Sequence, residues 1–264
     1  MALFTTRPFV EAVLSTKSDI SGSTMHVFEP EFHQEIYRSP AEIASASAHG
    51  SFQLADAILQ EPIHRGVQPE YSDDLDDPDS LAFIGMMTPD GTRLSKNNTD
   101  NVAAIKSVGI RSGYVDIDSS RSVSSEFFRL RTKRAGVQRN DLLINSTGDG
   151  TIGRVAVYHY DFPAVVDGHV SIIRFKNPDL AWYTAAYLLT NAGQHQIYRY
   201  INGSSGQVEI YPQDFERLVI PKASTKEISE IGNQLKLACT HFESFRTHLG
   251  ATIAQATQSS EKAS

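Results

Sequence analysis

The segment after Pro221 constrains the fold more than any other part of the chain. Ser224-Thr-Lys-Glu227 matches a capping box, in which a Ser hydroxyl and a Glu carboxylate each accept a hydrogen bond from a backbone N–H at a helix start. Apolar residues then recur at alternating spacings of three and four, as in a coiled-coil seam: Ile228, Ile231, Leu235, Ala238, Phe242, Phe245 and Leu249. The pattern predicts one long helix.

The length of this helix decides how it is expected to pack. Running to about Thr257, it would be about 50 Å long at the α-helical rise per residue. A rod of that length exceeds what one small domain covers, so we expect the apolar stripe to pair with a helix of another chain. The alternative is a helix folded back on its own domain. We therefore expect a domain over 1–221, with an N-terminal extension at 1–27, and a dimerisation or spacer helix over 222–264 with a disordered tail.

The net charge of the chain does not exclude a polyanionic partner. Among 264 residues the formal net charge is −7, and residues 61–90 alone hold eight acidic residues against one basic residue, Arg65. This stretch therefore accounts for the whole net charge. Residues 111–154 carry eight basic and five acidic residues, so the acidity is local and leaves open what the remaining surface binds.

The sequence lacks the residues that several functional classes require. The single cysteine, Cys239, excludes an internal disulfide and a Cys-based zinc site, and the acidic run 73–79 lacks the Gly and Glu of a calcium loop. No Walker loop, nucleophile elbow or helical His pair is present, so we expect no cofactor, no metal and no catalytic residue. No apolar run is long enough to span a membrane and the first residues do not resemble a signal peptide, which favours a cytoplasmic protein.

The motif Gly148-Asp-Gly-Thr-Ile-Gly153 matches a dinucleotide fingerprint in letters alone. That fingerprint needs a helix after its glycines, whereas Arg154-Val-Ala-Val-Tyr158 alternates like a strand. The glycines instead predict a tight turn between two strands, with Thr147, Thr151 and Arg154 exposed at its tip.

The remaining periodicity predicts an α+β fold. Short apolar or alternating runs predict strands at 81–86, 113–117, 126–131, 141–145, 153–158, 169–175 and 218–220, with 154–158 and 170–175 as neighbours in one sheet. Helices are predicted at 8–14, 40–48, 180–189 (with Asp179 as its N-cap) and 194–201, and a helical turn within 210–217.

Three polar loops have the composition of a nucleic-acid contact surface. They are the glycine turn, the segment 201–207 and the segment 63–71. Arg and Gln suit base edges in the major groove, whereas Ser, Thr and backbone amides suit phosphate oxygens. Taken singly, such a loop is more often an ordinary turn, but three of them in one sheet-rich domain favour a contact surface.

Five segments together resemble one family. They are Ile63-His-Arg-Gly-Val-Gln-Pro-Glu-Tyr71, Asn140 to Arg154 with its Gly-Asp-Gly-Thr-Ile-Gly turn, Val165 to Arg174, Asn202-Gly-Ser-Ser-Gly-Gln-Val-Glu-Ile210, and Leu218-Val-Ile-Pro221 before the long helix. Their order and content resemble a target recognition domain of the type I restriction–modification DNA specificity subunit, over about 28–255. Phe28-Glu-Pro-Glu-Phe32 is similar to the entry segment of such domains.

The resemblance implies a DNA-reading module with a curled mixed sheet and flanking helices, followed by a long coiled-coil-type helix. It implies a non-catalytic specificity component that binds double-stranded DNA and assembles with a methyltransferase subunit and a restriction subunit. A full specificity subunit holds two recognition domains and two long helices, and this chain has one of each. A half-size subunit that dimerises, a fragment, and part of a related defence system or single-chain enzyme remain alternatives.

These expectations define three residue sets. The predicted DNA contacts are Arg65, Gln68, Tyr71, Thr147, Thr151, Arg154, Asn202, Ser204, Ser205 and Gln207, and the predicted phosphate contacts are Arg129, Arg131, Lys133 and Arg134. The predicted helix-pairing residues are the seven apolar residues of the C-terminal stripe. The alternative function is a dimeric protein-interaction or inhibitor module that uses the acidic loop 73–79 as a nucleic-acid mimic.

Overall fold

The fold is built on short strands, and those at the centre of the two four-stranded sheets are buried on both faces. The computed structural model describes residues 30–55, 58–74, 76–203 and 208–261, so the predicted helix at 8–14 lies outside the described residues. One four-stranded antiparallel sheet has the order β2 (His64–Arg65), β9 (Val170–Ile173), β6 (Leu142–Asn145), β7 (Val155–Val157). The predicted strands at 141–145, 153–158 and 169–175 are confirmed.

A second four-stranded sheet makes the architecture mixed. Its order is β4 (Arg121–Val123), β3 (Val102–Ile105), β8 (Ala164–Val166), β5 (Gly136–Val137), and β3 pairs with β8 in parallel. A third, two-stranded sheet joins β1 (Ser51–Gln53) to β10 (Val219–Pro221), which is the strand predicted at 218–220. The predicted α+β class with a mixed sheet is therefore confirmed, and the strands divide among these three sheets.

Alternation along the strands of the first sheet places core residues on both of its faces. Leu142 and Ile144 of β6 point to a core shared with Trp182 and Ile197, whereas Leu143 points to a core shared with the second sheet. The expected pairing of 154–158 with 170–175 is wrong, because β6 lies between β7 and β9 and pairs with both. The central strand β6 pairs with β7 on one edge, as a hairpin, and with β9 on the other edge.

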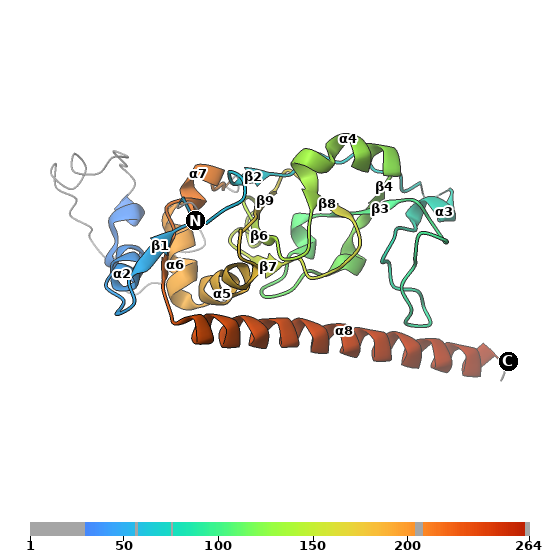
Figure 1. The fold of residues 1–264 in the computed structure, drawn as a ribbon. Coiled ribbons are helices and arrows are strands. Elements are labelled where there is room, and N and C mark those ends of the chain that lie inside the picture. The colour runs from blue at the N-terminus through green and yellow to red at the C-terminus, as the bar shows by residue number, and fades with distance from the viewer. Residues whose placement is uncertain (1–29, 56–57, 75, 204–207, 262–264) are drawn as a thin grey trace, which may run out of the picture.

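The helices flank these sheets (Figure 1). Their bounds, together with those of three short 3-10 turns, are η1 (Pro30–His33), α2 (Glu35–Ser45), α3 (Pro78–Leu81), η2 (Ser107–Gly109), η3 (Ile117–Ser119), α4 (Ser125–Ala135), α5 (Pro178–Leu188), α6 (Asn191–Arg199) and α7 (Pro212–Phe215). The predicted helices at 40–48, 180–189 and 194–201 and the helical turn within 210–217 correspond to α2, α5, α6 and α7. The N-cap of α5 is Asn177, not Asp179, since the Asn177 side chain accepts a hydrogen bond from the Asp179 N–H at 3.0 Å.

The predicted strand at 126–131 is wrong, because this segment forms α4. The Ser124 hydroxyl caps the helix by accepting a hydrogen bond from the Phe127 N–H at 3.1 Å. Glu126 lies in the first turn and Lys133 and Arg134 in the last, which complements the helix dipole. Phe127 and Ala135 are the buried residues that anchor the helix to the second sheet.

The predicted strands at 81–86 and 113–117 are also wrong. Leu81 ends α3, and the second segment leads into η3. Gly85 and Gly113 have φ angles of 91° and 102°, which interrupt extended backbone. Phe83 and Val115 are nevertheless buried, so these apolar runs supply core residues from irregular backbone.

The long C-terminal helix is α8 (Thr225–Glu261), and its capping box is confirmed. The Ser224 hydroxyl accepts a hydrogen bond from the Glu227 N–H at 3.3 Å, and the Glu227 carboxylate accepts one from the Ser224 N–H at 2.9 Å. The helix runs along α5 and past the β sheets, with its far end extending beyond the rest of the fold (Figure 1).

The expectation that the whole apolar stripe pairs with another chain is wrong in part. Ile228 and Leu235 pack on the core that α5 covers, and the Phe242 ring lies 3.9 Å from the Tyr114 ring, centroid to centroid. Ile231, Ala238, Phe245 and Leu249 are exposed; they form the outer stripe of α8. Three of the seven residues of the repeat thus face the chain's own domain, and the other four face outward.

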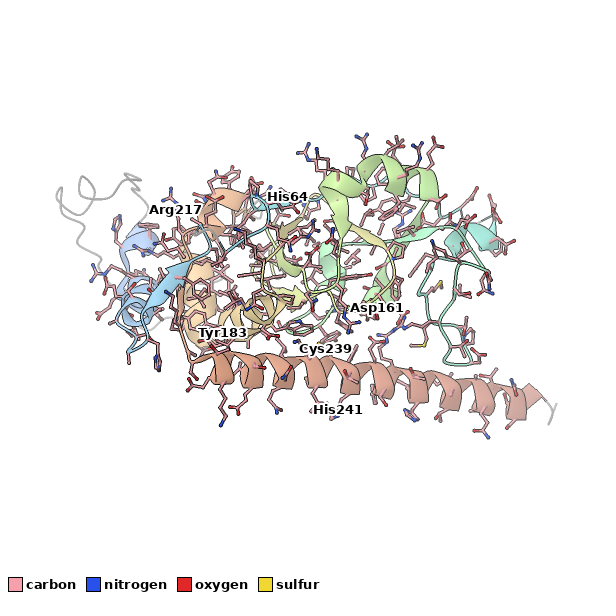
Figure 2. The ribbon with its side chains drawn as sticks, in the orientation of Figure 1. His64, Asp161, Tyr183, Arg217, Cys239 and His241 are labelled. Carbon is pink, nitrogen blue, oxygen red and sulfur yellow. The ribbon has the colours of Figure 1, made fainter. Side chains whose placement is uncertain are left out.

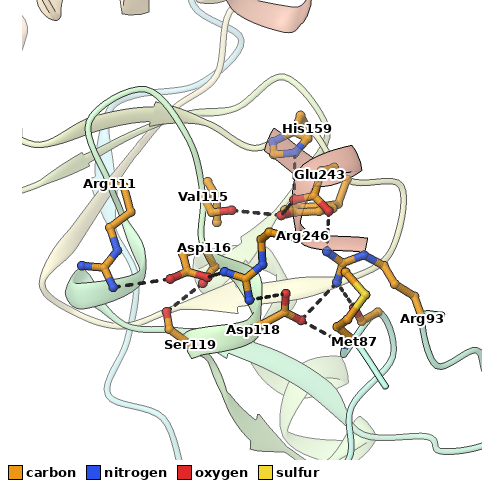
Figure 3. A network of polar contacts seen from close by, with 12 residues as sticks. Met87, Arg93, Arg111, Val115, Asp116, Asp118, Ser119, His159, Glu243 and Arg246 are labelled. Atoms are coloured by element: carbon orange, nitrogen blue, oxygen red, sulfur yellow. Dashed lines mark hydrogen bonds and ion pairs between the residues drawn. The ribbon is translucent and has the colours of Figure 1, made fainter. Parts of the chain in front are cut away.

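Ion pairs fix the middle of α8 to the domain (Figure 3). Glu243 pairs with Arg93 and accepts a hydrogen bond from the Tyr160 hydroxyl at 2.5 Å, while Arg246 pairs with Asp116 at 2.8 Å and Asp118 at 2.9 Å. Burial disfavours the Glu243 carboxylate, but hydrogen bonds from Tyr160 and Arg93, the charge of Arg93 and the His159 ring, whose Nε2 lies 3.8 Å from the carboxylate, lower its pKa to about 2. We call this group of contacts the α8 clamp.

No helix among the described residues combines the length and apolar character needed to cross a membrane. Polar and charged residues are distributed along the full length of α8, the longest helix described.

Candidate nucleic-acid interface

The glycine motif forms the predicted turn between β6 and β7. Gly148, Gly150 and Gly153 have φ angles of 96°, 80° and 80°, in the left-handed region that other residues rarely adopt. The buried Asn145 side chain holds the turn by donating to the Ser107 and Thr151 carbonyl oxygens at 2.7 and 3.1 Å. The spacing of the glycines therefore reflects backbone conformation, and no helix follows to hold a dinucleotide.

Thr147, Thr151 and Arg154 lie at this turn as predicted, but all three are half-buried. The Thr151 hydroxyl donates to the Thr147 carbonyl oxygen at 3.2 Å, and the Arg154 guanidinium donates to the Gly150 carbonyl oxygen at 3.0 Å. The Thr147 hydroxyl lies 2.6 Å from Nδ1 of His169, which is exposed at the start of β9. His169 was not among the predicted contacts; ahead of a strand its sequence context predicts a hydrogen-bonded structural histidine, and the contact with Thr147 agrees with that interpretation.

The predicted loop 63–71 contains β2, which carries Arg65 on the edge of the first sheet. A Cβ atom at Gly66 would overlap the carbonyl oxygens of Val166 and Asp167, so only glycine lets the chain pass this close to the second sheet. Gln68 is exposed beyond this point. The close approach fixes the position of Arg65 relative to β8 and β9.

Glu209 joins all three predicted loops. Its backbone forms antiparallel bridges with Thr147 and with Asn202, and the next residue, Ile210, donates to the Ser146 carbonyl oxygen at 2.8 Å. Its carboxylate pairs with the Arg65 guanidinium. Three segments that lie up to 145 residues apart along the chain therefore meet at one place.

Tyr211 completes this group, which we call the Glu209 node: Arg65, Thr147, Asn202, Glu209 and Tyr211. The Tyr211 side chain interacts with the Glu209 carboxylate, and the Arg65 guanidinium lies 5.6 Å from the Tyr211 ring centroid. The hydrogen bond and charge of Arg65 lower the pKa of Glu209, and the Glu209 contact raises that of Tyr211.

Glu209 and Tyr211 were missed by the sequence reasoning, although a signal was present. Val208-Glu-Ile-Tyr211 alternates between apolar and polar residues, and Val208 and Ile210 pack on the core. In extended backbone the side chains of Glu209 and Tyr211 then point together to the opposite side.

Four predicted contacts lie elsewhere or cannot be placed. Tyr71 packs against β4 in the second sheet, with the Arg121 guanidinium 3.6 Å from its ring centroid, and so lies apart from the Glu209 node. Ser204, Ser205 and Gln207 lie outside the described residues.

The four predicted phosphate contacts are exposed on α4; Arg129, Arg131, Lys133 and Arg134 form the α4 basic cluster. A shallow groove of about 460 Å³ lies between α4 and the segment around β2. It is lined by Glu61, Pro62, His64 and Val67 on one side and by Leu130, Arg131, Lys133 and Arg134 on the other. Because the segment is a helix and not the predicted strand, the side chains do not alternate between two faces, and all four are exposed.

The α4 basic cluster and the Glu209 node occupy one side of the molecule. β2 faces α4 across the groove. Its residue Arg65 also donates a hydrogen bond to the carbonyl oxygen of Ile210, which lies just before α7. In Figure 1, α4, β2 and α7 lie on the side opposite α8, and Figure 2 places His64 on that side. We call this surface the α4–β2–α7 face; its basic helix and polar turn have the composition of a nucleic-acid interface.

The acidic loop 73–79 uses several of its carboxylates within the chain. Asp73 pairs with Arg121 through two hydrogen bonds of 2.5 Å, Asp74 accepts a hydrogen bond from the Asp76 N–H at 3.0 Å, and Asp77 caps α3. These contacts give the loop a structural role. No observation favours its use as a nucleic-acid mimic.

Among the described residues no group of three or more His, Cys, Asp or Glu side chains is arranged to hold a metal ion. Cys239 faces the domain from α8, where burial raises the pKa of its thiol to about 11. A thiol in this state is a packing residue and a poor nucleophile at neutral pH.

No protein-family model and no curated protein matches the chain. Solved structures that match the chain include the type IIG restriction endonuclease BpuSI, at 10% identity over 88% of this chain and 34% of that one, with a TM-score of 0.49. They also include a component of a type I R-M system, at 12% identity over 85% of this chain with a TM-score of 0.43, and the HsdS subunit from Thermoanaerobacter tengcongensis, at 13% identity over 85% with a TM-score of 0.39. The chain spans 51% and 50% of the length of the last two structures.

Proposed function

We propose that this chain binds double-stranded DNA sequence-specifically, as the specificity component of a restriction–modification complex. The observation that carries the proposal is the meeting of the three predicted loops at the Glu209 node, on the same face as the α4 basic cluster. Basic residues on a helix suit phosphates, and polar side chains on adjacent turns suit base edges. The resemblance of the same loops to target recognition domains supports this assignment.

The proposed module is non-catalytic and directs a methyltransferase or endonuclease partner to its site. With a net charge of −7 the chain has no long-range attraction to DNA. Binding then depends on the local α4–β2–α7 face and on the additional basic surface that a catalytic partner supplies. Affinity measured with the partner should therefore exceed affinity of the chain alone.

Selection from random-sequence duplexes tests the proposal. The chain is incubated with the library alone and together with its cognate methyltransferase, and bound duplexes are sequenced. We expect a single consensus site in at least one of the two arms. Recovery of no consensus in either arm would contradict sequence-specific binding.

Self-association through the outer stripe of α8 is the second part of the proposal. Ile231, Phe245 and Leu249 are 41%, 61% and 46% exposed on one side of the helix. Replacing Phe245 by Glu should shift the sedimentation coefficient from dimer to monomer. Leu237, which is 47% exposed about 100° around the helix from Ala238, provides the matched control as Leu237→Glu. A wild-type chain that sediments as a monomer would contradict this part.

A further inference from the structure

Both terminal nitrogens of the Arg65 guanidinium make contacts within the chain, so Arg65 does not present a free edge to a base. Its Nη1 pairs with Glu209, its Nη2 donates to the Ile210 carbonyl oxygen at 2.5 Å, and its Nε is buried without a hydrogen-bond partner among the described residues. Bidentate recognition of guanine needs two adjacent free N–H groups pointing outward. Arg65 is therefore placed to position its neighbours.

Glu209 is the group that Arg65 positions. Its side chain is 33% exposed, its backbone is held by two antiparallel bridges, and the Arg65 contact keeps it ionised. The carboxylate is thus fixed on a face that carries the α4 basic cluster, with exposed acidic residues at Glu70 and Asp149 on the neighbouring loops. A carboxylate on a face that binds DNA repels phosphates. If Glu209 contacts DNA, its ligand must therefore be a hydrogen-bond donor of a base and not a phosphate.

An ionised carboxylate accepts hydrogen bonds and cannot donate them. In the major groove, the groups that donate are the exocyclic amino groups of cytosine and adenine, whereas guanine O6 and thymine O4 are acceptors. A carboxylate facing guanine or thymine would place two acceptors against each other. The chemistry of Glu209 therefore selects an amino-bearing base and rejects a carbonyl-bearing one.

The geometry points to Glu209 as a specificity-determining residue that accepts a hydrogen bond from the exocyclic amino group of a cytosine or adenine, with Arg65 as its positioning residue. This inference rests on the proposed function, since it requires that the α4–β2–α7 face binds duplex DNA. It assigns one base position of the recognition site to one side chain.

Selection from random duplexes with variants tests the assignment. Glu209→Gln keeps the shape of the side chain and an oxygen acceptor for Arg65, but it adds an N–H donor. At one base-pair position we expect the preference for cytosine or adenine to fall on the order of tenfold, with the other positions unchanged. Glu70→Gln is the matched control, because Glu70 is exposed on the segment after β2 and lies outside the Glu209 node.

The role of Arg65 is tested by the same readout. If Arg65 acts through Glu209, the Arg65→Ala/Glu209→Ala double variant should lose no more preference at that position than Glu209→Ala alone. A Glu209→Gln consensus identical to wild type at every position would overturn the assignment, as would an equal loss of affinity for all duplexes. A wild-type chain that selects no consensus would instead contradict the proposed function, so the two failures are distinguishable. The base that the wild-type chain selects at this position shows whether Glu209 accepts its hydrogen bond from cytosine or from adenine.

Discussion

Replacing Glu243 by glutamine should destabilise the protein in a pH-dependent way. In the α8 clamp the Glu243 side chain is 21% exposed and contacts Arg93 and Tyr160, which lowers its pKa from 4.5 to about 2. Each unit of pKa difference between the folded and unfolded states corresponds to about 1.4 kcal/mol, so the ionised carboxylate contributes about 3 kcal/mol to the free energy of unfolding.

The sign of the pH dependence follows from the lowered pKa. The contribution of Glu243 is fully present above the unfolded-state pKa of 4.5 and is lost as the pH falls toward the folded-state value of about 2. The glutamine variant has no such titration. At neutral pH the variant should therefore be less stable by about 3 kcal/mol, and the difference should disappear near pH 2. Other carboxylates titrate in both proteins and cancel in the difference.

Urea unfolding followed by the fluorescence of Trp182 measures this difference. Trp182 is the single tryptophan of the chain and lies beneath α8, with its Cβ near Gly232 and the Lys236 ammonium 5.7 Å from its ring centroid. Glu230→Gln is the control, since Glu230 is 61% exposed on the same helix and pairs with Lys226 at 3.7 Å. Equal stability of wild type and Glu243→Gln at neutral pH would refute the clamp, as would a difference that persists at low pH.

Four further perturbations test the fold and the interface. Arg174→Ala should cost about 3–5 kcal/mol in urea unfolding, because it leaves the buried Asp141 carboxylate without its ion-pair partner; a cost below 1 kcal/mol would contradict this. Gly66→Ala should reduce DNA affinity in equilibrium binding by moving β2 away from the second sheet, and unchanged affinity would count against the interface. Alanine at each residue of the α4 basic cluster should weaken binding to all duplexes equally and reduce the slope of log affinity against log salt by about one; a sequence-dependent loss would argue against phosphate contacts. Arg154→Ala should cost about 1–3 kcal/mol of binding if this residue reads a base, and unchanged affinity would remove it from the contact set.

The long helix shows what spacing alone could and could not predict. The capping box and the apolar repeat located α8 because both are local signals. The same repeat could not tell which residues face the domain, since an intramolecular surface and a partner helix favour the same spacing. The choice depends on the α8 clamp, whose partners Arg93 and Asp116 lie more than a hundred residues earlier in the chain.

Strands were predicted correctly where short runs of β-branched and aliphatic residues are fully buried. They were predicted wrongly where a helix cap or a left-handed glycine interrupts the extended backbone. β6, β7 and β9 are short and fully buried, and they followed from β-branched and aliphatic residues. The segment of α4 was assigned to a strand because the Ser124 cap was not weighed. Phe83 and Val115 are apolar because they fill the core from irregular backbone, which periodicity cannot distinguish from a strand.

The candidate interface was predicted as a set of loops but not as a site. Arg65, Thr147 and Asn202 were identified from their chemistry, and the structure brings them together. Glu209 joins them through backbone bridges to two loops and an ion pair to a third, and pairings at such separations carry no local sequence signal.

The most direct measurement of the central claim is the ratio of equilibrium affinities for the selected duplex and for a scrambled duplex of equal length and composition. Both affinities are measured at one salt concentration, with the methyltransferase partner present if selection requires it. Sequence-specific recognition predicts a ratio of about 10³ or more in favour of the selected duplex, and its reduction when the Glu209 node is altered. A ratio near one would contradict the account, because it would show that the α4–β2–α7 face binds DNA without reading its sequence.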